Sequence, residues 1–272
     1  MSAAEKAHVS RLYFLRGLTQ REIGDRLGVS RFKVARLLEE ARAEGIVRIE
    51  IADDVPQLDE LAAELERAFR LELAIVTQRS GDVPRAAAAL LPQLLRPDDV
   101  VGVAWGETLR ELVELLPTVG GGQHVVQICG AIPELASGTG PSEVALELAR
   151  RLGGGASLLP APAETEAIAQ LRENPAIRPT VTLFDQVTVA LVGIGAAGGG
   201  GYVLTHTFDD RGTLLDRKPA LALSLERPRL ARVIAAAGGP AKREAVRGAL
   251  RSGLLDVLAT DETCARFALA PA

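Results

Sequence analysis

The sequence predicts a multi-domain α/β protein, in which a small N-terminal winged helix-turn-helix domain precedes a larger three-layer α/β domain. Two short helical patterns meet at a glycine turn within residues 19–44. From residue 71 onward, short apolar runs alternate with helical segments, which is typical of a mostly parallel sheet covered by helices. The 272 residues also exceed what a helix-turn-helix needs, and a hydrophobic content of 47% can fill a second core.

The domain organisation follows from these patterns. Residues 5–16 form a helix that supports the helix-turn-helix, and the alternating segment 45–51 is its wing. The amphipathic helix at 58–70 packs on the larger domain or takes part in a subunit contact. We therefore expect a DNA-binding domain, a linker with a helix, and an effector-binding domain at residues 1–52, 53–70 and 71–272.

The helix-turn-helix itself depends on a few small residues. Gly28 suits the turn because glycine takes positive φ without strain, and Ser30 caps the second helix, which starts at Arg31. Gly24 lies inside the first helix, where glycine costs about 1 kcal/mol against alanine. We expect the second helix to cross there and to leave little room for a side chain. The residues predicted to join the two helices are Ile23, Leu27, Val29, Val34, Leu37 and Leu38.

The start of the second helix predicts binding to double-stranded DNA, because this end enters the major groove in such motifs. Arginine pairs with guanine, lysine suits a phosphate, and Phe32 could pack on a thymine methyl group. Alternatively, Lys33 and Arg36 form a solvated helix face, and Phe32 belongs to the core. Thr19 begins the preceding helix in a capping box with Glu22. The predicted DNA-binding residues are Thr19, Gln20, Ser30, Arg31, Phe32, Lys33 and Arg36.

Charge is distributed unevenly along the chain. Residues 1–50 contain ten basic and seven acidic side chains, a net charge of +3, whereas the remaining 222 residues contain 21 basic and 28 acidic ones, a net charge of −7. A basic N-terminal segment joined to an acidic remainder of the chain indicates local contact with DNA and no general affinity for nucleic acid. Because the positive excess is modest, we expect a homo-oligomer to be needed for useful affinity.

In the larger domain, glycine-rich turns follow the predicted strands at their carboxyl ends, where open α/β sheets bind ligands. Helix starts next to the first two of these turns suit a phosphate. Alternatively, the first is a tight turn in which Thr108 only caps a helix, and the AAGGGG segment at residues 196–201 is a mobile loop. No Rossmann or Walker sequence is complete, so we expect no nucleotide cofactor. The residues of the three turns are Gly106, Glu107 and Thr108; Ser137, Gly138, Thr139 and Gly140; Gly193 and Gly195.

Lys242 is the other candidate ligand for an anion. It lies in the first turn of a helix, where its charge opposes the helix dipole unless an anion compensates it. Asp209, in the sequence HTFDDRG, could orient sugar hydroxyls. The alternatives are a solvated lysine and an ordinary turn.

The chain shows no sign of a metal site, a membrane span or a signal peptide. Cys129 and Cys264 are far apart, no CxxC occurs, and the three histidines are isolated. No uninterrupted apolar run approaches 18 residues. We therefore expect a cytoplasmic protein with no metal, cofactor or membrane partner.

The chain resembles the SorC family of bacterial sugar-binding transcriptional regulators, which is related to DeoR-type regulators. The resemblance covers nearly the entire chain and implies an effector domain similar to phosphosugar isomerases, a dimer or tetramer, and operator affinity that changes when a sugar phosphate binds. It places Gly106, Thr108, Ser137–Gly140, Asp209 and Lys242 in the effector pocket. The chain departs from the family at 200–208, where an acidic residue tends to stand in place of Tyr202. The segments that carry the resemblance are LTQREIGDRLGVSRFKVARLLEEARAEGIVRIEI, VGVAWGETL, ALVGIGA, FDDRG and AAGGPAKREAVRGALRSGLLDVLATDETCA.

These observations predict a DNA-binding transcriptional regulator of a carbohydrate catabolic operon, controlled by a phosphorylated sugar that shifts the population between two quaternary arrangements. One alternative is a sugar-phosphate isomerase that carries a DNA-binding head. Isomerisation needs a base and an acid, and the nearest carboxylates, Glu107 and Glu143, have the first-turn positions that the helix dipole favours. Another alternative is a regulator that binds DNA constitutively after losing its ligand.

Overall fold

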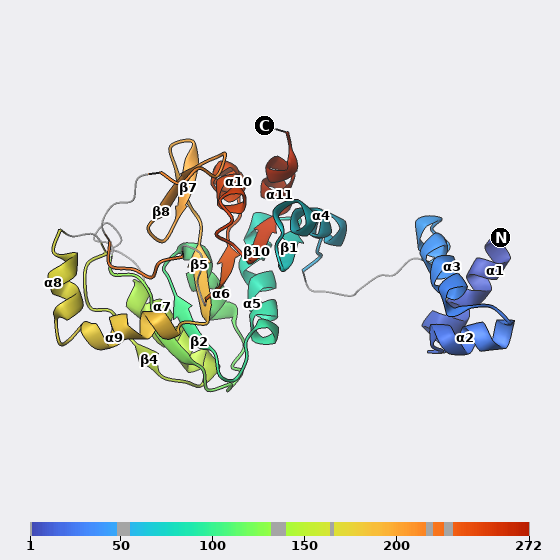
Figure 1. The fold of residues 1–272 in the computed structure, drawn as a ribbon, viewed down its shortest axis with the longest axis horizontal. Coiled ribbons are helices and arrows are strands. Elements are labelled where there is room, and N and C mark those ends of the chain that lie inside the picture. The colour runs from blue at the N-terminus through green and yellow to red at the C-terminus, as the bar shows by residue number, and fades with distance from the viewer. Residues whose placement is uncertain are drawn as a thin grey trace. The chain divides into compact units, whose positions relative to one another are not determined.

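The computed structural model describes residues 2–47, 55–131, 140–163, 166–215, 220–225 and 231–271. The chain forms two compact units, Met1–Asp54 and Val55–Ala272 (Figure 1). Within the described ranges, no helix is both long enough and apolar enough to span a bilayer.

The first unit is a helical bundle. Its elements are α1 (Ala3–Ser10), a π-helical turn (Arg11–Leu15), α2 (Gln20–Leu27) and α3 (Arg31–Ala43). Its core consists of Val9, Leu12, Ile23, Val34, Leu37 and Leu38, with Val29 packed at the margin.

Two expectations for the first unit need comment. The predicted packing of α2 on α3 is present except at Leu27, which is 39% exposed. Leu27 is the last residue of α2, and the chain turns away at Gly28 before it can be covered. Of the predicted wing, Gly45–Val47 form a turn, and residues 48–51 lie outside the described residues.

The turn between α2 and α3 is built as the sequence predicts. The Thr19 hydroxyl accepts the Glu22 N–H and the Glu22 carboxylate accepts the Thr19 N–H, which completes the capping box. Gly28 has φ +65°. A Cβ on Gly24 would lie 2.7 Å from the Val29 carbonyl oxygen and 3.4 Å from the Arg31 nitrogen. The turn and the start of α3 therefore exclude a side chain at position 24.

The second unit is built on a sheet of seven parallel strands, as the non-alternating apolar runs predict. The strand at its centre, β5, has the sequence VALVG and is buried along most of its length. In spatial order the strands are β1 (Leu73–Thr77), β10 (Val257–Asp261), β9 (Arg232–Ala236), β5 (Val189–Gly193), β2 (Val100–Val103), β3 (His124–Gln127) and β4 (Ala156–Ser157).

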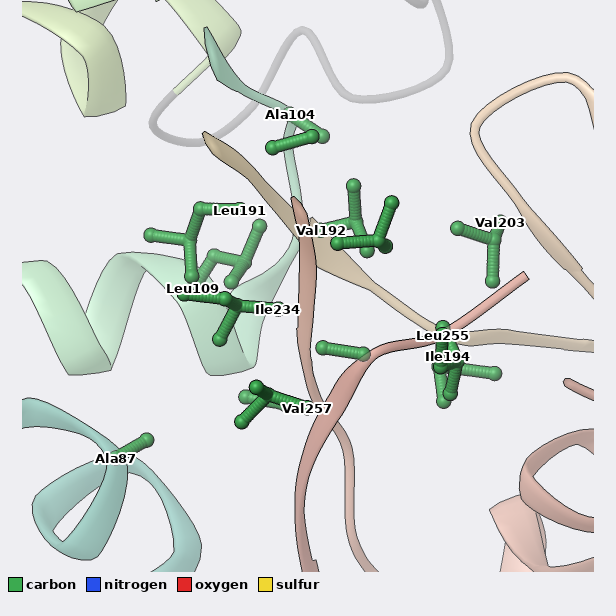
Figure 2. Close-up of a cluster of buried hydrophobic side chains, with 14 of the residues drawn as sticks. Ala87, Ala104, Leu109, Leu191, Val192, Ile194, Val203, Ile234, Leu255 and Val257 are labelled. Atoms are coloured by element: carbon green, nitrogen blue, oxygen red, sulfur yellow. The ribbon is translucent and has the colours of Figure 1, made fainter. Parts of the chain in front are cut away.

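Two groups of helices cover this sheet and complete a three-layer α/β fold. One group packs in the order α5 (Val83–Leu94), α6 (Glu107–Leu115), α7 (Pro141–Leu152). The other packs in the order α4 (Asp59–Phe69), α11 (Glu262–Leu269), α10 (Arg243–Arg251). Figure 2 shows part of the core, in which Leu109 of α6 lies beside Leu191 of β5 and Ile234 of β9. The amphipathic helix predicted at 58–70 is α4, and it packs within this unit on β1 and α11. Two short helices, α8 (Ile168–Glu173) and α9 (Arg178–Thr182), follow β4.

A second, antiparallel sheet was not foreseen from the sequence. It consists of β6 (Gly195–Ala197), β7 (Gly200–Val203) and β8 (His206–Asp209), and it packs on α10. The segment 196–201 is therefore not a loop throughout, since Ala196 and Ala197 belong to β6 and Gly200 and Gly201 begin β7. A Cβ on Gly201 would lie 2.5 Å from the Ala245 Cβ atom, so glycine here allows the strand to approach the helix.

Gln127, at the end of β3, joins three neighbouring stretches of chain. Its side chain is completely buried. The amide nitrogen donates to the carbonyl oxygens of Cys129 (2.9 Å) and Leu159 (3.3 Å). The amide oxygen accepts the Leu159 N–H (3.1 Å) and the Ser142 hydroxyl (2.9 Å). One primary amide thus fixes β3, the segment after β4 and the start of α7.

The close approach at position 24 makes a stability prediction. Gly24→Ala should destabilise the first unit although alanine is the better helix former by about 1 kcal/mol, because the new methyl group meets the Val29 backbone. Thermal unfolding of α-helix content by circular dichroism measures this loss. Asp25→Ala, on the exposed side of the same helix, is the matched control. The unfolding of the second unit, followed by fluorescence of the single tryptophan, Trp105, should stay unchanged. A Gly24→Ala protein as stable as the parent would contradict the steric explanation.

The Gln127 amide makes a second prediction. Gln127→Leu should lower the free energy of unfolding by about 3 kcal/mol, because polar groups of the half-buried Ser142 and the buried Leu159 lose their partners. Urea unfolding followed by Trp105 fluorescence measures the change. Gln123→Leu is the matched control, since the buried Gln123 amide donates one hydrogen bond, to the Arg96 carbonyl. If both variants lost the same free energy of unfolding, the four hydrogen bonds of Gln127 would stabilise the unit no more than the one hydrogen bond of Gln123.

Candidate functional site

The predicted DNA-binding residues lie around the start of α3. The Ser30 hydroxyl accepts the Lys33 N–H at 3.2 Å, so α3 begins at Arg31 as expected. Phe32 is 72% exposed, which rules out the alternative that it belongs to the core. The Arg31 guanidinium stacks on its ring at 4.8 Å from the centroid. Arg36 is exposed and lies 3.5 Å from the Glu40 carboxylate, and Lys33 is half-buried.

A cleft of about 530 Å³ connects the starts of α2 and α3. Its walls bring the predicted residues Thr19 and Gln20 together with Arg31. Arg21 also lines this cleft, although it is not among the residues predicted from the sequence. The signal was available, since a basic residue in the first turn of a helix opposes the dipole, as Lys242 does. The remaining lining residues are Tyr13, Gly17 and Leu18.

A buried lysine fixes α1 against α3. Lys6 is only 6% exposed, and its ammonium group lies 3.0 Å from the Glu40 carboxylate and pairs with Glu44. These hydrogen bonds, first to Glu44 and then to Glu40, raise the pKa of Lys6. Lys6 therefore holds α3 against α1, and its charge is already neutralised within the unit.

In the second unit, the parallel sheet brings the predicted effector turns to one edge. The turns follow β2, β3, β5 and β9, which are four consecutive strands of the sheet. The chain proceeds outward from β2 to β3 and β4, and in the opposite direction from β5 to β9 and β10. The point where the direction changes, between β2 and β5, is where sheets of this kind bind ligands.

Two helices at this edge begin with glycine. Gly106 precedes α6 and Gly140 precedes α7, and among the described residues no side chain caps either helix. By contrast, Thr19, Ser30 and Asp261 cap α2, α3 and α11. The α7 start is faced by its own carboxylate, because a Cβ on Gly140 would lie 2.9 Å from the Glu143 Oε2 atom. At the start of α6, Thr108 is half-buried and Glu107 is exposed. Of the two helix starts, that of α6 is thus the more accessible to an anion.

Lys242 comes to the same edge from β9. It ends the 3-10 turn Pro240–Lys242, which leads directly into α10, and its side chain is half-buried. Burial lowers the pKa of its ammonium group, and the Glu107 carboxylate, at the start of α6, opposes that shift. The structure therefore brings together two predicted residues that lie 135 positions apart. Lys242 is not the freely solvated lysine of the alternative interpretation.

The structure explains the glycine at position 195 by side-chain packing, whereas the sequence predicted close approach by a ligand. A Cβ there would lie 2.1 Å from the ring of Tyr202, the residue opposite it on β7. The space above Gly195 is thus filled by an aromatic side chain, which accounts for this glycine, and its contact with a ligand stays a prediction. At Gly193 a Cβ would have ordinary contacts, the nearest being the Trp105 carbonyl oxygen at 3.6 Å.

Asp209 forms a turn at the end of β8. Its Oδ1 atom accepts the N–H groups of Arg211 (3.0 Å) and Thr213 (2.8 Å). These bonds, first the one from Thr213, lower the pKa of the Asp209 carboxyl group. The carboxylate therefore organises its own loop, as the alternative interpretation allowed. The neighbouring Asp210 pairs with Arg247 of α10, which stacks on the Phe267 ring at 4.2 Å.

Several candidates remain to be placed. Ser137, Gly138 and Thr139 lie outside the described residues, and Gly140 is the first described residue after them. In the described part of the chain, no group of three His, Cys, Asp or Glu side chains is arranged to hold a metal ion. Both cysteines are buried free thiols, and burial raises the pKa of each to about 12.

Comparison with protein families divides the chain in the same way. Residues 53–270 match the family described as "Putative sugar-binding domain". Residues 4–44 match the family described as "Sigma-70, region 4", whose matched span covers the helix-turn-helix.

Characterised relatives span the whole chain. The transcriptional regulator LsrR of Enterobacter sp. (strain 638) is 28% identical over 305 residues, which cover 97% of this chain and 92% of that protein. The sorbitol operon regulator of Klebsiella pneumoniae is 27% identical, and the alignment covers 96% of each chain.

The solved structures agree. The crystal structure of the full-length sorbitol operon regulator SorC from Klebsiella pneumoniae superposes with a TM-score of 0.73 at 25% identity and covers 99% of both chains. A helix-turn-helix unit and a parallel α/β unit are thus combined here as they are in that regulator. The chain belongs to the SorC family of sugar-binding transcriptional regulators, and it is a sugar-responsive regulator of transcription.

Proposed function

We propose that the effector is a phosphorylated sugar and that its binding at the carboxyl edge of the parallel sheet changes the affinity of the helix-turn-helix for an operator. The regulated genes would be those of a carbohydrate catabolic operon, as the name of the sorbitol operon regulator suggests for that relative. The proposed effector contacts are made by Gly106, Thr108 and Lys242, with Gly140, Gly193 and Asp209 in the surrounding wall.

The observation that carries this proposal is the half-buried ammonium group of Lys242 at the edge where α6 begins without a side-chain cap. A buried cation is costly unless an anion lies near it. Glu107 compensates that charge in part. A phosphate would compensate it further and would also accept the free N–H groups of the first α6 turn.

A homo-oligomer would supply the DNA affinity that one weakly basic head lacks. In a dimer, two recognition helices would have to read successive major grooves on one face of the duplex, roughly 34 Å apart. The effector can change this spacing only if it binds the two quaternary arrangements with unequal affinity. We therefore propose a dimer or tetramer whose arrangement depends on the bound sugar phosphate.

We further propose that the site binds its ligand without converting it. Isomerisation needs a base next to the carbon-bound proton and an acid near the carbonyl oxygen. Glu107 lies at the start of α6, where its charge raises the pKa of Lys242, and Glu143 lies over the start of its own helix. Incubation with aldose and ketose phosphates, followed by chromatography, tests this, and net exchange between the two sugars would favour the isomerase alternative.

The cleft at the starts of α2 and α3 predicts which arginines bind DNA. Arg31→Ala should weaken operator binding by about 1–3 kcal/mol and relax base preference, as expected for a base contact. Arg21→Ala should weaken binding equally on all sequences and lower the salt dependence by about one unit of slope, as expected for a phosphate contact. Fluorescence anisotropy with the DNA upstream of the gene, at several salt concentrations, measures both. Arg11→Ala, an exposed arginine that does not line the cleft, is the control.

The Lys242 site predicts selectivity for phosphate. Lys242→Met should lower the affinity for the responsive sugar phosphate about tenfold or more, since a charge-assisted hydrogen bond is lost, and should leave operator binding without effector unchanged. Thermal shift and operator titration with glucose 6-phosphate, fructose 6-phosphate and their unphosphorylated parents measure this. Arg243→Met, the next and more exposed cation, is the control. If the parent sugars act as well as their phosphates, the proposed phosphate contact is wrong.

A further inference from the structure

The turn that carries Lys242 begins with two glycines, and each has a separate reason to be glycine. A Cβ on Gly238 would lie 2.7 Å from the Asp261 Oδ2 atom and 3.0 Å from a methyl group of Val83. Gly239 has φ +103°, a conformation that side chains disfavour. Position 238 therefore requires glycine because the Asp261 carboxylate occupies the space that a side chain would need. Position 239 requires glycine because the backbone has a positive φ there.

Asp261 lies at the end of β10, next to β9 in the sheet, and is only 2% exposed. Its Oδ2 atom accepts the Gly239 N–H, and its Oδ1 atom accepts the Cys264 N–H at 3.1 Å. The Cys264 thiol in turn donates to the Gly239 carbonyl oxygen at 3.3 Å. Both polar backbone groups of Gly239 are thus held by the first turn of α11 and its capping residue.

The position of Gly239 fixes the position of Lys242. The Lys242 N–H donates to the Gly239 carbonyl oxygen at 2.9 Å, which closes the turn Pro240–Lys242. The same carbonyl oxygen therefore receives the Cys264 thiol and the Lys242 amide. A displacement of Gly239 would move the Lys242 side chain relative to Glu107 and the start of α6.

We propose that Asp261 is a positioning residue for effector binding: it touches no ligand, and it holds the Gly239 turn so that the Lys242 ammonium group reaches the anion. This inference rests on the proposed function, in which Lys242 binds the effector phosphate. The simpler role of Asp261 is that of a helix cap for α11, which would affect stability alone. The two roles differ in what happens to Lys242.

The first experiment needs no effector. The chain contains four lysines, Lys6, Lys33, Lys218 and Lys242, so reductive ¹³C-methylation gives few signals, and Lys242→Met assigns the relevant one. In Asp261→Asn, which keeps the shape but cannot accept both N–H groups with a carboxylate, the Lys242 signal should shift and its pKa should move toward the ordinary value. The Lys6 and Lys33 signals should not change. An unchanged Lys242 titration in a folded Asp261→Asn protein would overturn the inference.

The second experiment is a double-mutant cycle with inorganic phosphate and fructose 6-phosphate as probes. Asp261→Asn should lower the affinity for both about tenfold in the parent protein, and should have no further effect in the Lys242→Met background, because the two residues act through one contact. An equal loss in both backgrounds would show that Asp261 acts independently of Lys242, and an unchanged affinity in the parent background would show that it acts on stability alone; either result would overturn the inference. Glu262→Gln, which disturbs an exposed ion pair in the same helix turn, is the control and should change nothing.

The design separates the two proposals. If the parent protein bound neither probe while Asp261→Asn still shifted the Lys242 signal, the phosphate effector would be wrong and the positioning of Lys242 by Asp261 would stand. Should Asp261→Asn fail to fold, Cys264→Ala removes only the thiol bond to Gly239 and leaves Asp261 with both N–H groups. It is expected to shift the Lys242 signal in the same direction by a smaller amount, and no shift would count against the inference.

Discussion

The parallel arrangement of the seven-stranded sheet is the constraint on which the second unit depends. Because every strand runs in the same direction, every strand-to-helix turn emerges at one edge, whatever its distance along the chain. Gly106 and Lys242 follow strands whose first residues lie 132 positions apart, and in the sheet only β5 lies between these two strands. The helix starts and the lysine are therefore brought together by strand direction and order, and no local feature of either segment is required.

Close backbone packing is the second recurring principle, and it operates in both units. Gly24 lets α3 begin against α2, Gly201 lets β7 lie on α10, and Gly238 lets the Asp261 carboxylate reach the Gly239 turn. In each case, the absence of a side chain allows a close contact to backbone or to a buried polar atom. These close contacts explain why glycine is tolerated at positions where it weakens a helix or a strand.

Compensation of buried charge connects structure with function. In the first unit, the buried Lys6 is satisfied by Glu40 and Glu44, so it serves the fold alone. In the second, the half-buried Lys242 has Glu107 as a partial counter-charge, which leaves its site able to gain from a bound anion. A ligand that meets this need in one quaternary arrangement better than in another would shift the equilibrium between them. The same residue type is thus paired with two carboxylates in one unit, whereas in the other unit its charge is compensated only in part.

The local structure was predictable from the sequence: the caps at Thr19 and Ser30, the turn at Gly28, and the apolar runs of the parallel strands. These depend on neighbours within a few residues or on burial on both faces, and both leave periodic or capping patterns. Three contacts arise only from the folding of the chain: Tyr202 fills the space over Gly195, Arg21 lines the cleft at the starts of α2 and α3, and Asp261 holds the Gly239 turn that leads to Lys242. Each of these contacts joins segments that are separate in sequence or depends on where a side chain points, and no pattern along one segment records it.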